Sequence, residues 1–176
     1  RDGPSNECIR DYYRLMAEDK VNTSRKDIND KKESVGGAKI IEIELFNENG
    51  KPVRNFKSGE KAMLRVIIEC FDDLKSPRVG FFIRMFDRTV IFDTNSSLLG
   101  YQINLAEKKT TLVVEFEFRI NLLKGTYSIG NHFEHNRRGN FYDYVDPAVI
   151  FNVTENYSHY GVVDLSPGIK VSEIKK

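Results

Sequence analysis

Apolar residues alternate with polar ones in several short stretches of this chain, and this period-two pattern limits the folds it can adopt. Leu64, Val66 and Ile68 alternate with Arg65 and Glu69. Similar apolar spacing recurs in residues 41–45, 112–118, 127–133 and 149–153. Successive side chains of a strand point to opposite faces of a sheet, so each stretch predicts a half-buried strand. The chain should therefore be rich in β-structure.

In residues 79–87, odd-numbered and even-numbered positions both carry apolar side chains, which indicates a strand that is covered on both faces. Further strands are expected at 89–92 and at 160–174, for a total of about eight or nine. Turn residues such as Asn49-Gly50 separate them. Short strands with regular turns favour two antiparallel sheets packed face to face. We predict an all-β antiparallel β-sandwich of the jelly-roll or immunoglobulin-like kind.

The first 37 residues do not follow the period-two pattern. Ile9, Tyr13 and Met16 recur at helical spacing, which predicts a short amphipathic helix within residues 1–18. Residues 19–37 are polar and charged without a sustained period, as is typical of a linker. The expected organisation is a terminal helix, a linker and one β-domain over residues 38–176.

Charge and cysteine content exclude several classes of protein. The 27 basic residues nearly balance the 26 acidic ones, so no global field draws in nucleic acid. No apolar run approaches the roughly 20 residues that span a bilayer, and no signal-peptide pattern opens the chain. Cys8 and Cys70 fall in a predicted helix and a predicted core strand, which does not suit a disulfide framework. We expect a cytoplasmic protein.

The sequence carries no recognisable catalytic or cofactor-binding constellation. Most acidic residues fall on polar strand parities or in turns, and no phosphate-binding glycine loop occurs. His132 and His135 would point to opposite sides of a strand, so no metal site is predicted. The basic run 135–139 precedes aromatic residues, but in a near-neutral domain a solvated loop explains it better than nucleic-acid binding. We expect no catalysis, metal or cofactor.

Parity does suggest a surface suited to sugars. Phe82 and Arg84 lie opposite the core parity of their strand, and His132 lies opposite the core parity of another. If the two strands share a sheet, these side chains combine an aromatic ring for a pyranose face with polar groups for its hydroxyls. The alternative is that Phe82 and Phe86 are covered by a loop or by a partner chain.

Several short motifs occur in a characteristic order and spacing: Gly37-Ala38-Lys39-Ile40, Ser58-Gly59-Glu60-Lys61, Val79-Gly80-Phe81-Phe82-Ile83-Arg84, Val90-Ile91-Phe92-Asp93-Thr94-Asn95, Leu123-Lys124-Gly125-Thr126-Tyr127 and Phe151-Asn152-Val153. Together they resemble the C-terminal module of Wzt-type subunits, the nucleotide-binding subunits of ABC transporters that export O-antigen polysaccharides. The opening residues 3–13 likewise resemble the end of the ATPase domain that precedes this module in the family.

This resemblance implies a non-catalytic sandwich that binds the exported O-antigen polysaccharide at the cytoplasmic face of the inner membrane. It also implies a homodimer, in some members formed by exchange of a terminal strand, and residues 160–165 resemble that closing strand. Further partners are the ATPase domain of the same subunit and a transmembrane subunit. The hypothetical sugar-binding residues are Phe82, Arg84, Asn95, His132 and Tyr142. The alternatives are a purely structural dimerisation domain and a carbohydrate-active enzyme.

Overall fold

The computed structural model describes residues 36–135, 140–154 and 160–171, and every helix or strand assigned within them is a strand. The prediction of an all-β chain is confirmed for these residues. The helix expected within 1–18 and the linker up to residue 35 lie outside the described residues. The strands are β1 (Ala38–Asn47), β2 (Asn55–Lys57), β3 (Lys61–Cys70), β4 (Leu74–Lys75), β5 (Arg78–Arg84), β6 (Val90–Asn95), β7 (Leu105–Ala106), β8 (Thr111–Arg119), β9 (Gly125–Glu134) and β10 (Phe141–Thr154).

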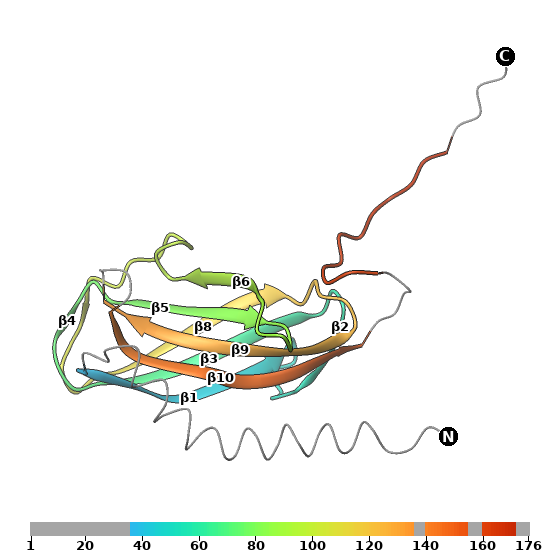
Figure 1. Cartoon of the computed structure of the whole chain (residues 1–176). Coiled ribbons are helices and arrows are strands. Elements are labelled where there is room, and N and C mark those ends of the chain that lie inside the picture. The colour runs from blue at the N-terminus through green and yellow to red at the C-terminus, as the bar shows by residue number, and fades with distance from the viewer. Residues whose placement is uncertain (1–35, 136–139, 155–159, 172–176) are drawn as a thin grey trace, which may run out of the picture.

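Most of these strands belong to two sheets that form two layers (Figure 1). One sheet has the order β1-β3-β8 and is antiparallel throughout. The other has the order β2-β10-β9-β5-β6, in which only β2 and β10 run parallel. β4 and β7 form a small separate pair. Within the described residues, no helix is long and apolar enough to span a bilayer.

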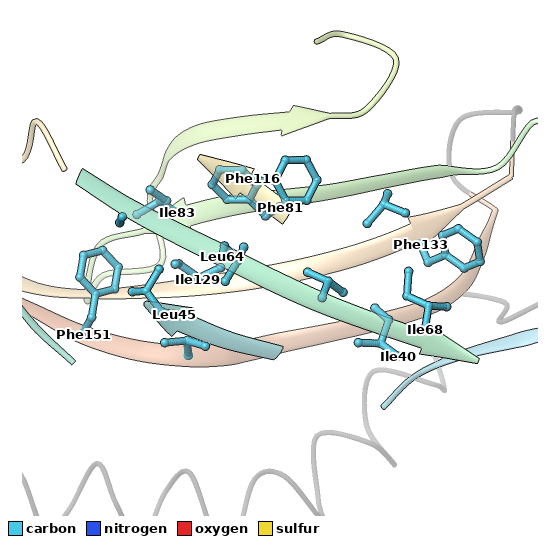
Figure 2. Packing of buried hydrophobic residues seen from close by; sticks show 14 of the residues in the cluster. Ile40, Leu45, Leu64, Ile68, Phe81, Ile83, Phe116, Ile129, Phe133 and Phe151 are labelled. Atoms are coloured by element: carbon cyan, nitrogen blue, oxygen red, sulfur yellow. The ribbon is translucent and has the colours of Figure 1, made fainter. Parts of the chain in front are cut away.

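The alternating pattern places one face of each sheet in a shared core (Figure 2). In β3, Leu64, Val66 and Ile68 are fully buried, as their spacing predicts. Phe81 of β5 reaches across the layers, with its ring centroid 5.0 Å from that of Phe116 in β8. Burial of such side chains contributes about 1.5–3 kcal/mol each, so this core is the main source of stability. The same cluster includes Cys70, as predicted, and its burial raises the pKa of the thiol.

The C-terminal segment differs from the prediction of a strand at 160–174. Within residues 160–171 the only β-pairing is an isolated bridge between Leu122 and Val163. Figure 1 shows this segment running away from the two layers. Its apolar side chains are exposed, 82% for Leu165 and 91% for Ile169. Beyond this bridge, none of the strands in the described parts of the chain pairs with the segment.

The strand expected at 79–87 is also shorter than predicted, since β5 ends at Arg84. A turn follows, in which the Arg88 amide donates to the Met85 carbonyl at 3.1 Å. Arg88 has a positive φ of 69°. Phe86 therefore lies in this turn, where it is 71% exposed, and not on the strand face that carries Phe82.

Candidate functional site

The outer face of the five-stranded sheet brings together three of the residues that parity singled out. β5 and β9 are neighbours, which confirms the condition on which that hypothesis depended. In their register Gly80 pairs with His132, Phe82 with Gly130 and Arg84 with Ser128. Phe82, Arg84 and His132 thus lie on one face, opposite the core. β6 adds Asn95, which pairs with Gly80.

Two glycines shape this face by letting aromatic rings lie across the neighbouring strand. A Cβ added to Gly130 would stand 2.1 Å from Cζ of Phe82. A Cβ added to Gly80 would stand 2.3 Å from Cε1 of His132. Carbon atoms in contact are roughly 3.5–4.0 Å apart, so neither position has room for a side chain. The rings of Phe82 and His132 therefore rest on glycine backbone.

Arg84 is held by three neighbours on this face. Its guanidinium forms an ion pair with Asp146, and Cζ lies 4.4 Å from the ring centroid of Phe82. Nη2 also lies 3.5 Å from the hydroxyl oxygen of Tyr144. The side chain is only 23% exposed. Arg84 is therefore neutralised by a carboxylate and covers the Phe82 ring, which leaves Phe82 only 3% exposed.

Tyr144 of β10 is one of the residues of this face that the sequence hypothesis missed. It pairs with His132, and its ring stacks on Phe82 with centroids 5.7 Å apart. Phe141 meets Tyr144 at 69°, with centroids 5.4 Å apart. Burial, reinforced by the Asp146 carboxylate, raises the pKa of Tyr144 to about 12. The hydroxyl thus stays protonated at neutral pH and can donate a hydrogen bond.

A second polar network lies toward the other end of the face. Arg78 Nε is 3.2 Å from Glu134 Oε1, and Asn95 Nδ2 donates to the same oxygen at 3.4 Å. His132 lies between two carboxylates, with Nε2 3.6 Å from Asp93 Oδ1 and Nδ1 4.0 Å from Glu134 Oε1. Asp93 is the exposed member, at 63% of its side chain. The network fixes His132 and presents one carboxylate to solvent.

Tyr142 does not join this face. It is buried, and its ring packs against the core residue Phe133 with centroids 5.3 Å apart. The register shifts between Phe141 and Asp143, so the simple alternation of β10 is broken there. This irregularity puts Phe141 and Tyr144 on the outer face and Tyr142 on the core side. Of the five hypothetical sugar-binding residues, four lie on the outer face.

The arrangement suits binding of a polar ligand that also has apolar surface. Phe141 and Tyr144 are half-buried rings, while Asp93 and Asn95 provide acceptors and a donor beside them. Among residues 36–135, 140–154 and 160–171, no group of three or more His, Cys, Asp or Glu side chains could hold a metal ion. A separate groove lies elsewhere, between the turn after β1 and the facing ends of β3 and β8.

Comparisons with known proteins agree with this architecture. Residues 29–165 match the family model described as Wzt C-terminal domain. A crystal structure of the C-terminal domain of wzt superimposes with a TM-score of 0.74 at 20% identity, covering 79% of this chain and 86% of that chain, which shows a common fold. A Niemann-Pick type C2 protein from Japanese carpenter ant gives a TM-score of 0.49 at 11% identity, covering 69% and 98%, too weak a likeness to bear on function. No curated protein matches.

Proposed function

Because the chain belongs to the Wzt C-terminal domain family, we propose that it binds an O-antigen polysaccharide and selects it for ATP-driven export by an ABC transporter. Binding takes place on the cytoplasmic side of the inner membrane, and no bond is made or broken in this chain. The observation that carries the proposal is the outer face of β5, β9 and β10, where aromatic rings stand beside hydrogen-bonding groups.

The proposed organisation places this face in a larger subunit. Residues 1–18 are the end of the preceding ATPase domain, 19–37 are a linker, and 38–176 are the carbohydrate-binding domain. Its two layers around one core support a β-sandwich of the jelly-roll or immunoglobulin-like kind. The partners are the ATPase domain of the same subunit, a transmembrane subunit and a second copy of this chain.

Titration of the chain with the O-polysaccharide of its source organism, beside an unrelated polysaccharide, tests the proposal. Arg84→Ala should weaken cognate binding at least tenfold, because it uncovers Phe82 and removes the guanidinium that neutralises Asp146. Arg65 is a matched control: it also pairs with a carboxylate, Glu115, and covers a ring, Phe46, but it lies on the other sheet. Absence of binding to the cognate polysaccharide, or equal losses in Arg84→Ala and Arg65→Ala, would contradict the proposal.

A purely structural dimerisation domain is the second candidate, and the exposed C-terminal segment favours it. Leu165, Ile169 and Val171 are exposed, and β8 is an edge strand of its sheet. An edge strand offers unpaired backbone groups to a strand from another chain. Exchange of residues 160–171 between two copies would bury the exposed apolar side chains of this segment and pair the free edge of β8. Dimerisation and sugar binding are compatible, so the titration above decides whether dimerisation is the whole function.

A further inference from the structure

The charges on the outer face of the five-stranded sheet bear on which glycans it can accept. Around the aromatic rings, on β5, β6, β9 and residues 141–146 of β10, the face carries two guanidinium groups, Arg78 and Arg84, and three carboxylates, Asp93, Glu134 and Asp146, while Lys57 of β2 lies at the far end of the sheet beside Thr154. Two positive and three negative charges leave a net charge of −1, which becomes 0 when His132 is protonated. In neither state does this part of the face have a surplus of positive charge.

Both arginines are already committed to carboxylates. Arg84 pairs with Asp146, and these side chains are 23% and 13% exposed. Arg78 pairs with Glu134 at 3.2 Å, with exposures of 19% and 8%. An anionic substituent on a sugar would have to compete with a largely buried carboxylate for either guanidinium, and a displaced carboxylate would lose the charge that neutralises it.

Asp93 is the charged group that an incoming ligand meets, since 63% of its side chain is exposed. A carboxylate has two oxygens that accept hydrogen bonds, and bonds from hydroxyl donors to a charged acceptor are stronger than neutral ones. His132 contacts Asp93 on one side, at 3.6 Å, and its ring meets Phe141 at 82° on the other. The carboxylate and the aromatic rings are therefore one side chain apart.

We propose that this face takes an uncharged, hydroxyl-rich part of the polysaccharide, with Asp93 accepting sugar hydroxyls beside Phe141 and Tyr144, and that it rejects glycans carrying phosphate, sulfate or carboxylate there. The inference rests on the proposed function. It makes Asp93, which parity reasoning passed over, a specificity-determining residue.

A matched pair of probes tests the inference. The first is the O-polysaccharide of the source organism, and the second is the same polysaccharide after selective oxidation of its primary hydroxyls to carboxylates. Calorimetric titration should give at least tenfold weaker binding of the oxidised form. Reduction of the carboxylates back to hydroxyls should restore binding, which separates the effect of charge from damage to the polymer.

Asp93→Asn should weaken binding of the unmodified polysaccharide about tenfold, because the amide offers one oxygen acceptor and no charge. The same variant should discriminate less against the oxidised form, since the like charge is gone. Glu117→Gln on the other sheet is the control and should change neither value. Far-UV circular dichroism confirms that each variant is folded.

The outcomes separate the two levels of the argument. If the unmodified polysaccharide does not bind at all, the proposed function fails and this inference falls with it. If it binds, but the oxidised form binds equally well or Asp93→Asn has no effect, the inference is overturned while the proposed function stands. If oxidised polysaccharide binds more tightly and Arg137→Ala/Arg138→Ala abolishes that gain, the basic pair selects an anionic glycan and the inference is also overturned.

Discussion

Substitution of Gly130 by alanine tests the packing of the outer face, because two opposing effects decide whether it raises or lowers the free energy of unfolding. Gly130 has no positive φ, so alanine suits its backbone, and replacing a glycine inside a strand should stabilise the fold by about 0.5–1 kcal/mol. The added Cβ, however, would lie 2.1 Å from Cζ of Phe82. A normal contact needs about 3.5 Å, so the ring must move by about 1.4 Å.

The ring has little space for that movement. Arg84 covers it at 4.4 Å from the centroid, and Tyr144 stacks on it at 5.7 Å. Overpacking of this kind costs about 1–3 kcal/mol, and loss of the stacked pair would cost about 0.5–1.5 kcal/mol more. These costs exceed the backbone gain, so we expect Gly130→Ala to lower the free energy of unfolding by about 1–3 kcal/mol.

Urea unfolding followed by far-UV circular dichroism measures this change, since the chain has no tryptophan to serve as a fluorescent probe. A double-mutant cycle with Phe82→Ala gives the decisive comparison. Without the ring there is no clash, so Gly130→Ala should then stabilise by about 0.5–1 kcal/mol. The reasoning is refuted if Gly130→Ala is neutral or stabilising in the presence of Phe82, or if its effect is the same in both backgrounds.

Three further predictions follow from burial and exposure. The pKa of Tyr144 lies near 12 instead of 10, so between these pH values the folded chain keeps a proton that the unfolded chain loses, and the free energy of unfolding should fall as the pH rises from 10 to 12. Tyr144→Phe should reduce this fall and remove the last step of the tyrosine absorbance titration, and an unchanged titration would contradict the prediction. Deletion of residues 160–176 should convert a dimer into a monomer in sedimentation experiments, and a dimer that survives deletion excludes exchange of this segment. In a Cys8→Ser background, Cys70 should react with a thiol reagent only as fast as the domain opens, because its thiol is buried and its pKa raised, so fast reaction under native conditions would be inconsistent with its position in the core.

Much of the fold could be predicted from local pattern. The alternation in β3 and β8 gave the buried faces, because each strand has water on one side and the core on the other. It also placed Phe82 and His132 on a common face, because β5 and β9 pair without a register shift from Arg78 to Arg84, so that side chains alternate regularly between the two faces. β2 escaped prediction, because three residues are too short to show a period.

The residues that parity misassigned lie where long-range contacts control the backbone. Residues 141–148 contain polar residues and a proline and do not read as a strand, yet they belong to β10. There the Asp143 carboxylate accepts a hydrogen bond from the Ile40 amide at 2.7 Å, a contact between residues 103 positions apart. The shift in register next to it leaves Tyr142, a hypothetical sugar-binding residue, on the core side and puts Tyr144 on the outer face. A local pattern holds no information about such a distant partner.

The second irregularity in β10, between Val145 and Val149, divides this long strand into two parts with separate tasks. Residues 141–146 supply rings and a carboxylate to the outer face, whereas Phe151 and Val153 fill the core. Because the irregularity absorbs changes in register, substitutions in the first part need not shift the second. If the outer face binds a glycan as proposed, a lineage could change which glycan it recognises through the first part of β10 while the core packing of the second part stays the same.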